Sequence, residues 1–251
     1  MELGLGGKGV VVTGASRGIG RAIALEFAAE GTNVAICARG KAALDVTRAE
    51  LEARHAKTHA QVCDVANPEA LTDFLSRSRE RLGRIDVLVN NASGFATSDD
   101  EAGWQASIAV DLMASVRATW QVVPWMAADG GGVVIHIAST SGLEAGSPPA
   151  YAAAKAALIS HSKSLAATLA PQGIRVNCVA PGSIEFPGGE WEQTKQSMPA
   201  IYERIRDTIP FGRLGTPEEV AAAAVFLASN RASWISGVTL AVDGVQHKGN
   251  L

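Results

Sequence analysis

The stretch Val10-Val11-Val12-Thr13-Gly14-Ala15-Ser16-Arg17-Gly18-Ile19-Gly20 opens as a short β-branched run and passes through a glycine-rich turn into a helical pattern. Glycines in such a turn let the backbone approach a pyrophosphate closely, and the helix N-terminus offers free N–H groups to phosphates. A strand-to-helix junction is the context that distinguishes this motif from a merely tight turn. The stretch therefore predicts a dinucleotide-binding turn formed by Gly14, Ser16, Arg17, Gly18, Ile19 and Gly20.

Short β-branched runs alternate with longer helical patterns from this turn to the far end of the chain. The predicted strands are Val10–Thr13, Asn33–Ala38, His59–Cys63, Ile85–Asn90, Val133–Ala138, Ile174–Val179 and Val238–Val242. The predicted helices are Ile19–Gly31, Lys41–His55, Pro68–Leu82, Trp104–Ala127, Ala150–Ala170 and Pro217–Ser229. Because such alternation gives right-handed crossovers, we expect an α/β fold: a Rossmann-type, doubly wound parallel sheet of about seven strands with helices on both faces.

The bulk composition is that of an ordinary globular protein. Of 251 residues, 47% are hydrophobic and 19% are charged, and the net charge of −3 gives no support for binding nucleic acid or anionic membranes. Residues 1–12 do not resemble a signal peptide, and no apolar run reaches the roughly 20 residues that span a bilayer. The three scattered cysteines indicate reduced, buried thiols rather than a disulfide framework or a metal site. We expect a cytoplasmic protein without a metal ion.

One segment, from Pro181 to Pro210, departs from the strand–helix alternation. It begins with a proline- and glycine-rich stretch and continues as an amphipathic run. An insertion of this size in a compact domain is usually a lid or binding loop. The sequence therefore predicts a single domain over residues 1–251 with a substrate flap at about 183–209. The apolar side chains of the flap either line a substrate pocket, opposite Phe95 and Leu143, or pack as core.

The glycines of the first turn follow the spacing Gly-x-x-x-Gly-x-Gly, which is one residue longer at its first gap than the ordinary dinucleotide fingerprint. Far along the chain, Tyr151 and Lys155 stand four residues apart in a helical segment, and Ser139 lies twelve residues before the tyrosine. With these motifs in register, the chain resembles the short-chain dehydrogenase/reductase family over essentially its whole length. The resemblance is to the branch of ordinary length that includes 3-oxoacyl-[acyl-carrier-protein] reductase-like enzymes.

The residue types of this signature suit carbonyl chemistry. Reduction of a carbonyl requires a proton donor to the oxygen as hydride arrives, and oxidation requires the reverse. A tyrosine is a weak base at neutral pH, and a neighbouring ammonium favours its ionised form. The resemblance implies that Tyr151 exchanges the proton, that Lys155 supports it and binds the nicotinamide ribose, and that Ser139 polarises the substrate oxygen. The predicted function is interconversion of a secondary alcohol and a carbonyl by direct hydride transfer.

The choice of cofactor is expected at the end of the second predicted strand. An acidic residue there would bind the adenosine ribose of NAD and repel a 2′-phosphate, but the chain has Cys37-Ala38-Arg39-Gly40. Arg39 together with Arg17 offers charge-assisted bonds to a phosphate dianion. Either arginine alone is also compatible with a solvated surface side chain. The two arginines together, without the acid, predict NADP(H).

The resemblance assigns further cofactor contacts to the carboxyl ends of three strands. These are Asp64 and Val65 for the adenine, Asn90 and Ala92 for the groove after the fourth strand, and Pro181, Gly182 and Ile184 for the turn beside the nicotinamide. The chain also departs from the family's pattern. Ser93 precedes the glycine that usually follows the Asn-Asn-Ala run, and Glu185-Phe186-Pro187 occupies a stretch in which a threonine often binds the carboxamide.

A further departure is Asp111, which stands where similar enzymes carry a catalytic asparagine. An ionised aspartate only accepts hydrogen bonds, whereas asparagine also donates them. Our hypothesis is that Asp111 still acts as a fourth catalytic residue by holding a water that relays protons to Lys155. The alternative is a relay that is slower or differently connected.

The resemblance implies two kinds of partner, a small carbonyl or alcohol substrate and further copies of the chain in a homodimer or homotetramer. Candidates for that interface, with burial in the core as the alternative, are Trp120, Trp125, Met126, Leu158 and Leu165. Two other functions compete with the enzyme. A non-catalytic NADP(H) sensor would not need Ser139, Tyr151 and Lys155 in register. A nucleotide-sugar epimerase or dehydratase would have a different glycine spacing and a larger C-terminal substrate domain.

Overall fold

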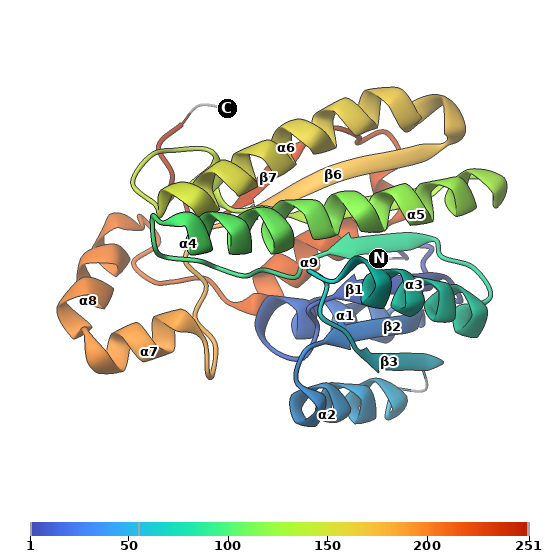
Figure 1. Ribbon diagram of the computed structural model, residues 1–251, viewed down its shortest axis with the longest axis horizontal. Helices are drawn as coiled ribbons and strands as arrows, with labels where there is room; N and C mark the ends of the chain where they lie inside the picture. The colour runs from blue at the N-terminus through green and yellow to red at the C-terminus, as the bar shows by residue number, and fades with distance from the viewer. Residues whose placement is uncertain (1, 55, 250–251) are drawn as a thin grey trace.

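The computed structural model describes residues 2–54 and 56–249 and shows one parallel sheet (Figure 1). Its strands are β1 Gly9–Thr13, β2 Asn33–Ala38, β3 Thr58–Val62, β4 Val87–Asn90, β5 Gly132–Ile137, β6 Ile174–Pro181 and β7 Thr239–Val242. They lie in the order β3-β2-β1-β4-β5-β6-β7, and every neighbouring pair is parallel. The predicted doubly wound α/β fold is confirmed, and the order reverses between β1 and β4, where ligands of such sheets bind.

Helices cover both faces of the sheet. They are α1 Gly18–Ala29, α2 Lys41–Glu52, α3 Pro68–Leu82, α4 Glu101–Ala106, α5 Ala114–Ala128, α6 Pro149–Leu169, α7 Glu190–Ser197, α8 Pro199–Thr208 and α9 Pro217–Ala228. In β1, Val10 and Val12 join the core beneath α1 and α9, and Val11 joins the core beneath α3 and α5. Strands buried on both faces explain the nearly continuous apolar runs in the sequence. The predicted end of α2 at His55 lies outside the described residues.

The helix predicted over Trp104–Ala127 consists of three elements. Between α4 and α5 the chain forms a π-helix over Ser107–Met113, and α5 itself contains Pro124. In a π-helix each hydrogen bond spans five residues instead of the four of an α-helix. The hydrophobic spacing of the sequence therefore does not reveal it. The π-helix packs against α6 and carries Asp111, which is fully buried.

Helices α7 and α8 form most of the segment expected as a flap and project from the sheet at the left of Figure 1. This segment has a small apolar cluster of its own, in which Trp191 packs against Tyr202, Ile209 and Leu214. Met198 and Ile201 remain exposed. Part of the predicted apolar stripe is therefore local core, and the role of the segment as a substrate flap stays a prediction.

The residues proposed for an interface between copies of the chain differ in how far they are exposed. Met126 and Leu158 are buried within the chain, so they pack as core, whereas Trp120 is 64% exposed. The three cysteines are free and buried, as predicted. Across the described residues, each helix is too short or too polar to pass through a bilayer.

Candidate active site

A cavity of about 440 Å³ opens where the turns after β1, β4, β5 and β6 meet α6 and the segment before α7. Because the carboxyl ends of parallel strands share one edge of the sheet, these turns come together although they are far apart in sequence. Predicted site residues that line the cavity are Gly14, Arg17, Ile19, Gly20, Arg39, Ser139, Tyr151, Lys155, Pro181, Gly182 and Ile184. Predicted residues outside its lining are Ser16, Gly18, Asp64, Val65, Asn90, Ala92 and Asp111.

The turn after β1 is shaped by close backbone approaches. Gly14 has a φ of +69°, and a Cβ there would lie 2.7 Å from the Cα of Ala92. A Cβ on Gly20 would lie 2.4 Å from the carbonyl oxygen of Gly14. Only glycine fits these positions, and α1 begins at the cavity wall with its first N–H groups free of helical partners. The turn therefore has the geometry that a pyrophosphate requires.

The asparagine that supports this turn is Asn91 rather than Asn90. Its Nδ2 donates to the carbonyl oxygens of Thr13 at 2.9 Å and Gly14 at 3.0 Å. Asn90 points into the protein instead, where its Nδ2 lies 3.2 Å from Nδ1 of His136. Since side chains alternate across a strand, adjacent residues at the end of β4 face opposite ways, and the sequence did not indicate which one faces the cavity.

The two arginines expected to bind a 2′-phosphate both line the cavity and are both exposed. Arg17 also holds the segment before α7, because its Nη1 donates to the carbonyl oxygen of Gly188 at 2.8 Å. In the same region the ring of Phe186 lies against Gly18, where a Cβ would be 2.6 Å from the ring. The segment before α7 thus lies over the glycine turn, a contact that the sequence did not predict.

Helix α6 directs Tyr151 and Lys155 towards the end of β5, where Ser139 follows the strand. Both α6 side chains are buried, and the lysine Nζ lies 5.5 Å from the centre of the tyrosine ring. That ammonium donates to the carbonyl oxygen of Ile137 at 3.1 Å. Phe95 packs edge-on against Tyr151 at 4.9 Å and is itself 43% exposed. All three signature residues line the same cavity as the glycine turn.

Asp111 contacts Lys155 directly, with an Oδ1–Nζ distance of 3.2 Å. This direct contact differs from the expected arrangement, in which Asp111 holds a water that relays protons to Lys155. The aspartate carboxylate also accepts hydrogen bonds from the Ser93 hydroxyl at 2.5 Å and the Gly94 amide at 3.2 Å. Two of the departures from the family's pattern, Ser93 and Asp111, are therefore bonded to each other.

Behind Lys155 lie two buried groups that the sequence did not single out. Burial, with smaller contributions from His161 and Lys155, lowers the pKa of His136 to about 3. Burial raises the pKa of the Cys178 thiol to about 11. Both groups are therefore uncharged around neutral pH.

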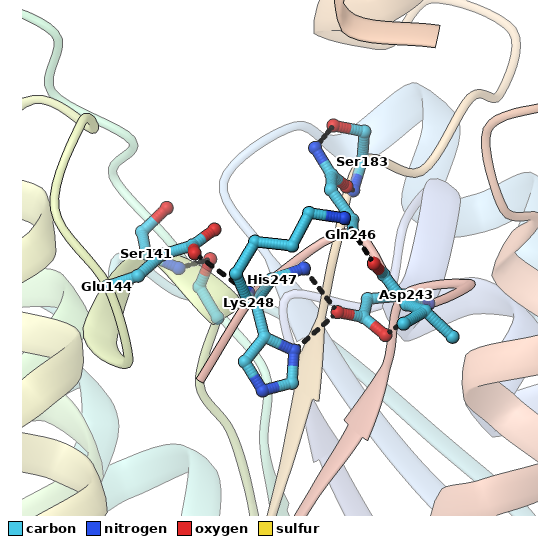
Figure 2. Close-up of polar contacts among 9 residues, drawn as sticks. Ser141, Glu144, Ser183, Asp243, Gln246, His247 and Lys248 are labelled. Atoms are coloured by element: carbon cyan, nitrogen blue, oxygen red, sulfur yellow. Dashed lines mark hydrogen bonds and ion pairs between the residues drawn. The ribbon is translucent and has the colours of Figure 1, made fainter. Parts of the chain in front are cut away.

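The C-terminal segment forms polar contacts with the turn after β6 and with the loop after β5 (Figure 2). Gln246 accepts from the Ser183 amide at 2.8 Å and donates to the Ser183 hydroxyl at 3.0 Å. Asp243, at the end of β7, binds the ring of His247 at 2.6 Å. The amide of Lys248 donates to Glu144, in the loop after Ser139, at 3.1 Å. These contacts connect the turn after β6 to the loop after β5.

Glu185 has a structural contact where the family often has a threonine. Its carboxylate accepts from the Tyr202 hydroxyl at 2.6 Å and from Lys195 Nζ at 2.9 Å. Lys195 also lies over the Tyr202 ring, at 5.0 Å. Glu185 therefore anchors α7 and α8 to the turn after β6.

The doubly wound sheet, the glycine turn and the cavity between them define a dinucleotide-binding protein of the Rossmann class. A family model described as Enoyl-(Acyl carrier protein) reductase matches residues 14–245. The chain belongs to the short-chain dehydrogenase/reductase family.

Curated relatives match it from end to end. Isoepoxydon dehydrogenase of Aspergillus clavatus is 38% identical over 255 residues, covering 98% of this chain and 96% of the relative. The 3-oxoacyl-[acyl-carrier-protein] reductase of Thermotoga maritima is 37% identical over 246 residues, covering 96% of this chain and 98% of the relative. These matches confirm the resemblance that the motifs indicated.

Two solved structures share the fold closely. L-sorbose reductase from Gluconobacter frateurii, complexed with NADPH and L-sorbose, has a TM-score of 0.91 and 36% identity, with 99% of this chain and 100% of that one covered. A 7α-hydroxysteroid dehydrogenase, complexed with NADH and 7-oxo glycochenodeoxycholic acid, has a TM-score of 0.90 and 31% identity, with 97% and 96% covered. Members of the family with this fold thus bind either nicotinamide cofactor.

Proposed function

We propose that the chain is an NADP(H)-dependent oxidoreductase that interconverts a secondary alcohol and a carbonyl. The observation that carries this proposal is the presence of Ser139, Tyr151 and Lys155 in the cavity that the glycine turn also lines. The closely approached glycines and the free start of α1 fit a dinucleotide pyrophosphate. When bound, the cofactor supplies hydride in reduction and accepts it in oxidation.

The residues of the chain supply the proton chemistry and the orientation. In reduction, the Tyr151 hydroxyl donates its proton to the developing alkoxide, and in oxidation the ionised tyrosine removes the proton from the alcohol. Lys155 stabilises the ionised tyrosine through its ammonium charge. Ser139 binds the substrate oxygen and holds it beside the tyrosine. Phe186, in the segment before α7, covers the glycine turn at Gly18.

Preference for NADP(H) rests on charge at the adenosine end of the cavity. Arg17 and Arg39 both line it, and β2 ends in Ala38, without an acidic residue. A carboxylate at this place would repel a 2′-phosphate, whereas two guanidinium groups attract it. The NADPH complex of the sorbose reductase supports this proposal, and the NADH complex of the steroid dehydrogenase makes it necessary to test it.

The test compares NADPH and NADH consumption against a panel of ketones, sugars and thioesters. The native protein is expected to prefer NADPH. Replacing Arg39, which has no part in holding the segment before α7, by alanine is expected to lower kcat/KM for NADPH by roughly ten- to a hundredfold and to leave NADH unchanged, since a charge-assisted bond contributes about 1.5–3 kcal/mol. Arg48→Ala on α2, which pairs with Asp45 and lies outside the cavity, is the matched control. Equal use of both cofactors by the native protein would contradict the NADP(H) assignment.

The second candidate function is an NADP(H) sensor without catalysis. It shares the glycine turn and differs only in having no use for the three signature residues. Tight NADPH binding without turnover on any member of the panel would favour it.

We also propose that the protein is cytoplasmic and forms a homo-oligomer. Trp120 on α5 and Trp234 after α9 are 64% and 99% exposed, and large exposed aromatic side chains are typical of interfaces. Sedimentation should show a dimer or tetramer, and a monomer at micromolar concentration would contradict the proposal.

A further inference from the structure

Ser93 lies between the cavity and a buried ion pair. Its side chain lines the cavity, and its hydroxyl donates to Asp111 at 2.5 Å. Asp111 is completely buried and Lys155 is 2% exposed, with 3.2 Å between carboxylate and ammonium. A buried carboxylate is stable in one position only where hydrogen bonds satisfy its oxygens, and here Ser93 and the Gly94 amide provide them.

The charge of Lys155 has one buried counter-charge in the part of the chain that the structure describes, the Asp111 carboxylate. His136, from β5, is neutral above about pH 3, and Cys178, from β6, is neutral below about pH 11. Burial also lowers the pKa of His161, which lies beside His136. The charged side chains that line the cavity on other elements, Arg17, Arg39 and Glu190, are exposed, and water and salt screen them.

We propose that Ser93 is a positioning residue: its hydroxyl fixes the Asp111 carboxylate against Lys155, and this compensation of the lysine charge keeps Tyr151 protonated up to a higher pH. The proposal deepens the proposed function, because Tyr151 is its acid and base. An uncompensated Lys155 ammonium next to Tyr151 would favour the ionised form of the tyrosine. The Lys155–Asp111 pair carries no net charge, so it favours that form less. Compensation of the lysine charge therefore favours the proton-donating form of the tyrosine, which is the form that carbonyl reduction uses.

The chain allows a test that needs no substrate, because it has only two tyrosines, Tyr151 and Tyr202. In a Tyr202→Phe background, the ultraviolet absorbance of tyrosinate reports Tyr151 alone as the pH is raised. Asp111→Asn should move the midpoint of this titration to lower pH by about one unit or more, a tenfold change in proton affinity per unit. Ser93→Ala should move it in the same direction by less, and Ser93→Thr, which keeps the hydroxyl, should retain the native midpoint.

A double-mutant comparison shows whether Ser93 acts through Asp111. In the Asp111→Asn background, Ser93→Ala should cause no further shift of the midpoint. Ser98→Ala, on the same loop but bonded to Asp100, is the matched control and should leave the midpoint unchanged. Circular dichroism verifies that each variant is folded, and Ser93→Cys serves as a second small substitution if Ser93→Ala does not fold.

A native midpoint in Ser93→Ala, or an equal shift with and without the aspartate, would overturn the proposal. Because the titration is independent of turnover, failure of the proposed function appears separately, as a native protein that consumes neither cofactor with any substrate of the panel. Where turnover is measurable, the pH dependence of alcohol oxidation should shift in the same order as the titration midpoints.

Discussion

At the scale of single residues, this protein places an ion pair where its relatives' pattern has a lysine and an asparagine. A buried ion pair contributes little net stability, because the desolvation of both charges offsets their attraction. Its value lies in fixing one arrangement, and the contacts of Asp111 with Lys155, Ser93 and Gly94 are those of a fixed carboxylate. Two of the residues that depart from the family's pattern, Ser93 and Asp111, thus form one bonded unit.

Tyr151→Phe should abolish turnover while leaving cofactor binding intact. The hydroxyl is the proposed proton donor, and general acid–base catalysis contributes roughly a hundred- to ten-thousandfold in rate. Fluorescence titration with NADPH and a turnover assay would measure the two effects. Tyr202→Phe is the comparison, and because this hydroxyl binds Glu185, the change should affect KM rather than kcat. More than a few per cent of native turnover in Tyr151→Phe would refute the assigned role.

His136→Asn should reduce the sensitivity of the fold to acid. Burial depresses the pKa of His136 from 6.5 to about 3, so between these values the unfolded chain binds a proton that the folded chain does not. The free energy of unfolding therefore falls as pH is lowered through this window. From pH 6.5 to pH 5 the loss is up to about 2 kcal/mol, at about 1.4 kcal/mol per unit. Urea unfolding at pH 7 and pH 5 measures it, and an identical pH dependence in both proteins would show that His136 does not contribute.

At the scale of elements, regular patterns in the sequence predicted regular structure. Helix α3 runs over Pro68–Leu82 and β2 over Asn33–Ala38, as their patterns indicated. The helix before the fifth strand was predicted as continuous, but it contains the π-helix over Ser107–Met113. The widened turn of the π-helix is stabilised by tertiary contacts, here the contact between Asp111 and Lys155 of α6. No residue pattern within Ser107–Met113 predicts such a turn.

Glu185→Ala should loosen α7 and α8 without destabilising the sheet. The substitution removes the acceptor of the Tyr202 hydroxyl, a contribution of about 1 kcal/mol, or roughly fivefold in the population of an opened flap. Hydrogen exchange should accelerate over residues 190–208, and KM for the substrate should rise. Glu203→Ala, on α8 and paired with Arg206 of the same helix, is the control. Unchanged exchange in Glu185→Ala would mean that the apolar cluster alone holds the flap.

At the scale of the whole molecule, the C-terminal segment joins the two strand ends that flank the site (Figure 2). Gln246→Met keeps the size of the side chain and removes both bonds to Ser183, whose amide then lacks its partner at a cost of about 1–3 kcal/mol. We expect a lower melting temperature and weaker binding of NADPH, measured by thermal unfolding and by titration. Lys248→Met is the matched control, because it keeps the backbone amide that binds Glu144 and removes an exposed bond from the ammonium to the carbonyl oxygen of Val245, away from Ser183. Equal effects of both changes would show that the segment stabilises the fold without shaping the site.

The sequence by itself determined the doubly wound sheet, the glycine turn and the Ser139–Tyr151–Lys155 signature. Each of these depends on residues that are close in sequence, so that spacing and periodicity carry the information. Only the tertiary structure decided that Asn91 rather than Asn90 supports the turn, that Asp111 meets Lys155 directly, and that Ser93 completes this contact. These contacts join different elements. They depend on which way side chains point at the end of β4 and on the widened turn of the π-helix over Ser107–Met113. Their geometry is set by packing, which local patterns in the sequence do not encode.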